Sequence, residues 1–217
     1  MNTHTLVAGL RRDLAEVEER IIAHPWLAEL EAGRLPASAL RVFAGEQLHI
    51  IPSDLRSFEM LGQRFPGEPA HGYAASMLAG ERAALGALDR FANAVGLDSS
   101  ARESYEPVPG CQAYPSYVAR LSRDGTAAEV AGAFLVNLAA WGNCCARMAE
   151  ALTSVYRLTA DDCAFFVGFA GPVTELERTS LEVIDAGLAE GAEPARIARA
   201  ARLLQAYELL YWTSLPR

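Results

Sequence analysis

Apolar residues recur along this chain at the spacing of an α-helix almost throughout, and no stretch alternates between apolar and polar residues as a strand would. The pattern therefore predicts an all-α protein. Prolines, glycines and capping residues divide it into helical segments at about 5–23, 25–33, 38–65, 70–95, 112–123, 127–153 and 159–189, with a last one from 194 onward. Seven or eight helices with short connections predict an antiparallel bundle, and we expect one domain over residues 1–217.

Local signals predict how these segments begin, bend and end. Ser38 and Thr126 are the expected N-caps of two long helices, and Glu129 would complete a capping box with Thr126. Pro52 should kink its helix because it lacks the amide hydrogen and crowds the preceding turn. Pro25 should begin the second helix and Gly33 should end it. A later helix should begin at Thr159 with Asp162 and bend across Gly168–Pro172, and the last helix should begin at Glu193-Pro194.

Three of the apolar stripes are interrupted by a polar residue. Gln47 lies among Phe43, Ile51 and Phe58, Asn137 lies among Phe134, Trp141 and Met148, and Glu208 lies among Leu204, Tyr211 and Leu215. Each polar side chain should therefore point into the core, where a carboxylate is seldom found without a partner or a task. Either three helices each deliver one polar group to a shared interior site, or each group is satisfied separately by backbone or water.

The composition narrows the possible functions. A net charge of −8 without a basic cluster disfavours binding to nucleic acid or to anionic lipid, and no apolar run is long enough to span a bilayer. All basic residues are arginine, so the sequence offers no lysine amine for a Schiff base, for pyridoxal phosphate or for a P-loop. Cys111, Cys144, Cys145 and Cys163 have no metal-binding spacing, which indicates free thiols in a reducing, cytoplasmic setting.

Motifs at both ends of the chain resemble one known family. His24-Pro25-Trp26 and Gly33-Arg34-Leu35-Pro36 resemble the N-terminal signature of the TenA and thiaminase II family, and Tyr207-Glu208-Leu209-Leu210-Tyr211-Trp212 resembles its C-terminal signature. The resemblance covers nearly the whole chain in spacing. It implies the haem-oxygenase-like fold, which that family shares with the pyrroloquinoline quinone synthase PqqC, and assembly as a homodimer or homotetramer.

The resemblance also implies positions for an active site. TenA enzymes cleave an aminopyrimidine from its leaving group with a cysteine nucleophile, an aspartate, ring-framing tyrosines and a C-terminal glutamate. By spacing, Glu208 matches that glutamate and Tyr114 matches one tyrosine, whereas Gln47 stands at the aspartate position and Asn137 at the nucleophile position. Phe169 stands near a further tyrosine position. Because an amide is neither a nucleophile nor a general base, the covalent mechanism of the family is not expected here.

We therefore expect a pocket for a small heterocyclic molecule. In this reading Glu208 is the catalytic acid or base of a hydrolysis of the thiamin-salvage type, without a cofactor or metal. The residues expected to bind the substrate are Gln47, Tyr114, Asn137, Trp141, Phe169 and Tyr211. Cys144, seven residues after Asn137, is a candidate displaced thiol, although helix cysteines are usually inert packing residues.

Two other functions remain open at this stage. The pocket could serve a non-catalytic binding or regulatory protein. A haem-oxygenase-like oxygenase is the other alternative, because Glu46 and His49 are three residues apart and Glu81 follows, which is half of a metal site. The only histidines are His4, His24, His49 and His71, so the late histidine ligands of the haem-oxygenase-like diiron oxygenases have no counterpart.

Overall fold

Helices are the only regular elements in the part of the chain that the computed structural model describes, residues 2–171 and 174–217. The prediction of an all-α protein is therefore confirmed. The helices are α1 (Thr3–Ile22), α2 (Pro25–Glu31), α3 (Ala37–Arg64), α4 (Ala70–Ala94), α5 (Ser99–Glu103), η1 (Pro109–Gln112, a 3-10 turn), α6 (Ala113–Asp124), α7 (Ala127–Ser154), α8 (Ala164–Phe169), α9 (Thr174–Ala189) and α10 (Pro194–Ser214). Within the same ranges, no helix is both long and apolar enough to cross a membrane.

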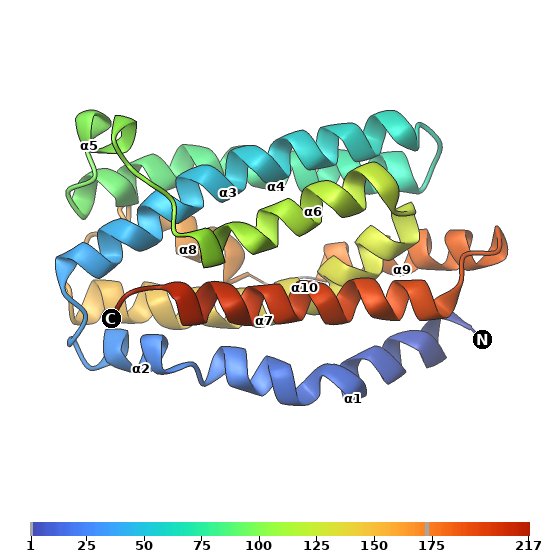
Figure 1. Cartoon of the computed structure of the whole chain (residues 1–217), viewed down its shortest axis with the longest axis horizontal. Helices are drawn as coiled ribbons and strands as arrows, with labels where there is room; N and C mark the ends of the chain where they lie inside the picture. Colours follow the sequence, from blue (N-terminus) through green and yellow to red (C-terminus); the bar gives the residue numbers. More distant parts are fainter. Residues whose placement is uncertain (1, 172–173) are drawn as a thin grey trace.

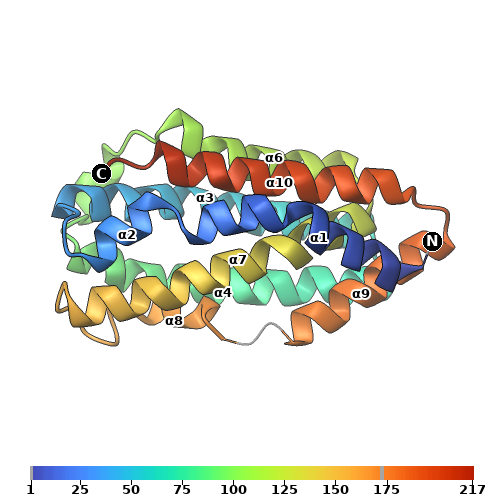
Figure 2. The ribbon, with the colours of Figure 1, turned by 90° about the horizontal axis from the view of Figure 1, so that it is seen from below.

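The long helices form an antiparallel bundle. Figure 1 shows α3 and α4 running side by side in opposite directions, and α6 returning above α7 and α10. Helices α1, α7 and α10 point the same way, and α1 lies along both of the others (Figure 2). The described ends of the chain lie at opposite ends of the bundle (Figure 1). The last turns of α10 pack against the first turns of α3, where Phe43 contacts Tyr211 and Trp212.

Side chains cap two of the helices, and the cap at Thr126 was predicted from the sequence. The Nδ1 atom of His24 accepts a hydrogen bond from the Trp26 amide at 3.3 Å and caps α2, and Thr126 Oγ1 accepts from the Glu129 amide at 3.2 Å and caps α7. Gly33 ends α2 with a φ of 70°, a backbone conformation that glycine adopts without strain. The N-cap predicted at Ser38 is wrong, because α3 already begins at Ala37 after Pro36.

The structure divides two stretches differently from the prediction. The short helix α5 was not expected, and segment 159–189 is two helices instead of one bent helix. Thr159 and Asp162 do exchange the predicted capping hydrogen bonds, but the next residues form turns and α8 begins only at Ala164. Pro172, the last residue of the expected bend, lies outside the described residues. Pro52 lies inside α3 without interrupting it.

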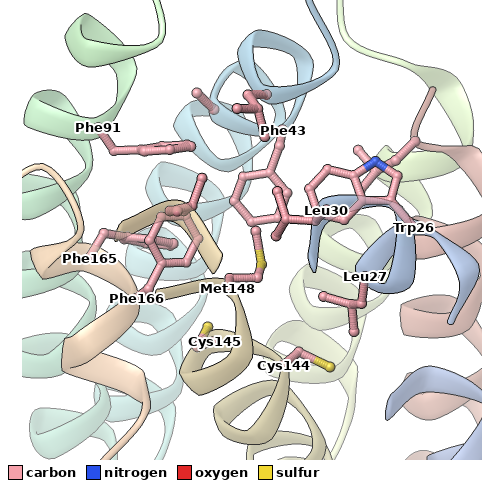
Figure 3. Packing of buried hydrophobic residues seen from close by; sticks show 14 of the residues in the cluster. Trp26, Leu27, Leu30, Phe43, Phe91, Cys144, Cys145, Met148, Phe165 and Phe166 are labelled. Carbon is pink, nitrogen blue, oxygen red and sulfur yellow. The ribbon is translucent and has the colours of Figure 1, made fainter. Parts of the chain in front are cut away.

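The core consists of two apolar clusters along the bundle. The first contains α2, the first half of α3 and the second half of α7, together with the last turns of α10. It is rich in aromatic rings, and Figure 3 shows Phe43 between Trp26 and Phe166, with ring centroids 5.6 and 5.7 Å from the two. The second cluster contains α1, the end of α3 and the first halves of α7 and α10. Each of these amphipathic helices thus buries its apolar face in one or both of the clusters.

A layer of buried polar residues lies between the two clusters. Four long helices contribute residues to both clusters. On each of them a buried polar residue stands between the residues of one cluster and those of the other. These residues are Asp54 on α3, Glu81 on α4, Asn137 on α7, and Gln205 with Glu208 on α10. Tyr114 of α6 packs against both clusters. We call these six residues the polar layer.

Truncation of a ring in the first cluster should destabilise the fold strongly. Phe43 is fully buried and contacts aromatic rings from α2, α4, α7, α8 and α10. We expect Phe43→Ala to lower the free energy of unfolding by about 3–5 kcal/mol in urea titrations, because it leaves a cavity. Met60→Ala, on an exposed position of the same helix, is the control and should change it by less than about 1 kcal/mol. Equal losses in the two variants would contradict this description of the core.

Candidate functional site

A cavity lies at the level of the polar layer. It encloses about 500 Å³ of space between atoms, its opening to solvent included. Its walls come from α3, α4, α6, α7, α8 and α10. The lining residues are Gln47, Ile50, Ile51, Asp54, Glu81, Tyr114, Phe134, Asn137, Leu138, Trp141, Phe169, Glu208 and Tyr211.

All seven residues that the sequence suggested for a site line this one cavity. The three residues that interrupt apolar stripes are buried, with exposed fractions of 4% for Gln47, 1% for Asn137 and 3% for Glu208. Asn137 is hydrogen-bonded to Glu208, whereas Gln47 is hydrogen-bonded to Tyr211, another residue that lines the cavity. The three polar groups therefore share one interior site and are not satisfied separately by backbone or water. The remaining members are Tyr114, Trp141, Phe169 and Tyr211.

Glu208 is the carboxyl group at the centre of this arrangement. Its Oε1 atom accepts a hydrogen bond from Trp212 Nε1 at 3.3 Å, and its Oε2 atom accepts one from Asn137 Nδ2. Burial raises the pKa of Glu208 to about 7, although these two hydrogen bonds act in the opposite direction. A carboxyl with this pKa can donate and accept a proton near neutral pH, which suits an acid or base.

Asn137 holds Glu208 in place. Its Nδ2 group donates to Glu208 and also to Gln205 Oε1 at 3.1 Å, while its Oδ1 atom accepts from the Tyr114 hydroxyl at 3.2 Å. Both amide hydrogens are thus already used inside the protein. Asn137 therefore positions Glu208 and Tyr114, and the direct contact with a substrate that the sequence suggested stays a prediction.

Aromatic rings make one wall of the cavity. Trp141 lies parallel to Phe43 with the ring centroids 6.3 Å apart, and it meets the edges of Phe169 at 5.9 Å and Tyr211 at 6.4 Å. Gln47 Nε2 donates to the Tyr211 hydroxyl at 2.9 Å and fixes that ring. Rings held at steep angles to one another offer flat surfaces to a flat ligand.

Two further carboxyl groups, Asp54 and Glu81, line the cavity and were not recognised as a pair from the sequence. Burial, and then the neighbouring Glu81, raise the pKa of Asp54 well above its usual range, against the effect of Arg56. Burial raises the pKa of Glu81 to about 8. Because two adjacent buried carboxylates repel each other, the pair retains a proton near neutral pH. The missed signal was spacing, since Asp54 follows Gln47 by seven residues and shares its helix face.

Glu46 and Glu81, two of the three residues that suggested half of a metal site, have different surroundings in the structure. Glu46 accepts hydrogen bonds from the Tyr105 hydroxyl at 2.6 Å, the Val108 amide at 2.7 Å and Gln112 Nε2 at 2.7 Å. Glu46 thereby ties the segment before α6 to α3, whereas Glu81 lines the cavity. Over the described ranges, no three acidic, histidine or cysteine side chains lie close enough together to hold a metal ion.

The cysteines do not replace the missing nucleophile. Cys111, Cys144, Cys145 and Cys163 are all free and buried, as Figure 3 shows for two of them, and none is among the residues that line the cavity. Burial raises the pKa of the Cys144 thiol, which keeps it neutral and poorly reactive. The idea of a displaced thiol at Cys144 is therefore not supported by its position.

A groove between α4 and α8 lies next to the cavity. Glu81, Leu138 and Phe169 line both the groove and the cavity, so they form the boundary between the two. The other groove residues are mainly small or apolar, including Met77, Gly80, Ala84, Phe165 and Gly168.

Comparison with protein families gives one extensive match. The profile described as the TENA/THI-4/PQQC family matches residues 11–217. This is the family that the terminal motifs resemble, so the prediction from sequence is confirmed. A comparison with curated protein sequences finds no match.

Several solved structures are similar over almost the whole chain. A TenA homologue from Pseudomonas syringae pv. tomato has a TM-score of 0.80 at 12% identity, covering 96% of this chain and 91% of that one. A TenA homologue from Pyrococcus furiosus has a TM-score of 0.77 at 16% identity, covering 97% and 100%. A domain with a haem-oxygenase-like fold from Shewanella denitrificans has a TM-score of 0.77 at 15% identity, covering 96% and 89%. The predicted haem-oxygenase-like fold is confirmed.

The buried carboxyls should make stability depend on pH. Asp54, Glu81 and Glu208 all have a raised pKa in the folded state, so that state binds more protons than the unfolded chain between about pH 4.5 and pH 8. The free energy of unfolding should therefore fall as the pH rises from 5 to 8. Urea titrations across this range measure the slope.

The variant Asp54→Asn/Glu81→Gln removes two of these groups and should flatten that slope. At pH 8 it should be more stable than the wild type by at least about 1 kcal/mol, the free energy of one pKa unit. Glu59→Gln, at an exposed position of α3, should keep the wild-type slope. A stability that rises from pH 5 to pH 8 would show that the three carboxyls are ionised in the folded protein.

Proposed function

The chain belongs to the TENA/THI-4/PQQC family, and on this basis we propose that its interior cavity binds a small, flat, amine-bearing heterocycle of the aminopyrimidine class. The observation that carries the proposal is Glu208, a buried carboxyl whose pKa lies near neutrality inside an aromatic-walled cavity. The family relationship supplies the ligand class, and the cavity supplies matching chemistry.

The edge of an aminopyrimidine offers an amino N–H donor next to a ring nitrogen acceptor. A protonated carboxyl offers an acceptor and a donor side by side, so the two can form a pair of hydrogen bonds. Glu208 meets this requirement because burial keeps a large share of it protonated at neutral pH. Trp141, Phe169 and Tyr211 would then contact the faces and edges of the ring.

The proposed reaction is hydrolysis of the carbon–nitrogen bond in an aminomethyl substituent of the ring, and the amino group on the ring itself stays in place. Water forms the new carbon–oxygen bond, the carbon–nitrogen bond breaks with its electron pair leaving on nitrogen, and the proton given up by water ends on the released ammonia. Glu208 lends a proton to the ring nitrogen while the bond breaks and takes it back afterwards. Water is the nucleophile in this scheme because Asn137 stands where the family resemblance implies a cysteine.

A non-catalytic binding protein is the second candidate. It is favoured by Asn137, whose amide hydrogens are occupied by Glu208 and Gln205 and whose side chain cannot attack a substrate. In this case the same cavity would bind the heterocycle and release it unchanged. Both candidates share the assembly as a homodimer or homotetramer that the family resemblance implies, and the cytoplasmic location that the free thiols indicate.

Turnover tests the catalytic proposal. Metal-free protein with 4-amino-5-aminomethyl-2-methylpyrimidine should release ammonia and the hydroxymethyl pyrimidine, measured by an enzyme-coupled ammonia assay and by chromatography. Glu208→Gln should reduce this activity by at least about 100-fold, the contribution expected of a general acid or base. The amide side chain introduced by this substitution keeps one acceptor oxygen, so the variant should lose only about 1–3 kcal/mol of stability and remain folded.

Glu150→Gln, an exposed position on α7, is the matched control and should retain wild-type activity. Equal turnover by Glu208→Gln and wild type would reject Glu208 as the proton carrier. Saturable binding without any product, in folded wild-type protein, would establish the binding protein instead.

A further inference from the structure

Asp54 has a buried oxygen atom with no partner. Its side chain is 3% exposed and lines the cavity, and its Oδ1 atom makes no hydrogen bond within residues 2–171 and 174–217. A buried acceptor that is left unpaired costs about 1–3 kcal/mol. An oxygen in this condition beside an open cavity indicates that a ligand supplies the missing donor.

Glu81 adds a second carboxyl at the same place. It is 8% exposed and comes from α4, the helix that packs against α3. It also lies at the boundary between the groove and the cavity. None of the cavity-lining residues named above is basic, so the lining carries three carboxyl groups and no cation of its own. The groups that interact with Asp54 are Glu81 from α4, Tyr114 from α6 and, on its own helix, Arg56.

The carboxyl pair of Asp54 and Glu81 lies at a different level of the bundle from Glu208. Gln47 and Tyr211 are hydrogen-bonded and therefore lie at one level. Asp54 lies about 10 Å further along α3, seven residues on, whereas Glu208 is only about 4.5 Å from Tyr211 along α10. Because α3 and α10 run in opposite directions, both displacements point toward the second apolar cluster (Figure 1). A ring paired with Glu208 would need a substituent to reach Asp54.

We propose that Asp54 and Glu81 form a second binding subsite in the cavity, one that binds a protonated primary amine on the substituent of the ligand. An ammonium group has three N–H donors and a positive charge, so it satisfies the free Asp54 oxygen and neutralises the carboxyl pair. A hydroxyl in the same place gives one donor and no charge. This inference rests on the proposed function, and it adds that the site selects an aminoalkyl substituent over a hydroxyalkyl one.

Paired probes test the selection. The two probes are 4-amino-5-aminomethyl-2-methylpyrimidine and its 5-hydroxymethyl counterpart, which share the ring and differ in one group. Stopped-flow tryptophan fluorescence at pH 7 reads binding before turnover, because Trp141 lines the cavity. Wild-type protein should bind the amine at least tenfold more tightly than the alcohol. Asp54→Asn/Glu81→Gln should lose this preference, mainly by weaker binding of the amine, and still bind the alcohol.

Two controls separate this inference from the proposed function. Glu208→Gln should weaken both probes to a similar degree and keep the preference, and Glu59→Gln should change neither. If the wild type binds neither probe, the proposed function and the inference both fail. If it binds both probes equally, or if the double variant keeps the tenfold preference, the subsite is refuted while the proposed function stands.

Discussion

The structure depends on placing several ionisable side chains in one layer inside an apolar bundle. Two apolar clusters stabilise the helices on either side, and the polar layer between them contributes carboxyl groups from α3, α4 and α10. Full ionisation of three buried carboxyls would be very costly in so apolar a setting. The pKa of each is instead raised by burial, so the layer keeps protons near neutral pH.

Hydrogen bonds around the layer give it a fixed geometry. Asn137 connects Glu208, Gln205 and Tyr114, which belong to α10 and α6, while Gln47 connects α3 to α10 through Tyr211. Glu46 anchors the segment that leads into α6 and so fixes the start of the helix that carries Tyr114. The residues that the resemblance places at the family's aspartate and cysteine positions, Gln47 and Asn137, are thus amides that orient other side chains, which leaves Glu208 as the central proton carrier of the proposed site.

Much of this was predictable from sequence because helical periodicity reports directly which residues face a core. The all-α bundle, the cap at Thr126 and the burial of Gln47, Asn137 and Glu208 all follow from local spacing. The pairing of Asp54 with Glu81 did not follow, because it depends on how α3 packs against α4, a contact that spacing along one helix does not specify. The role of Asn137 was likewise hidden, since its hydrogen bonds join residues that are distant in sequence.

The most direct test of the account is a crystal structure of the protein with 4-amino-5-aminomethyl-2-methylpyrimidine bound to Glu208→Gln, which is expected to slow turnover. The account predicts the ring against Trp141 and Tyr211, its amino edge at position 208 and its ammonium group within hydrogen-bond distance of Asp54 and Glu81. Binding of the ligand outside the cavity, or with its amine directed toward the aromatic wall, would contradict the claim that the polar layer is the ligand site.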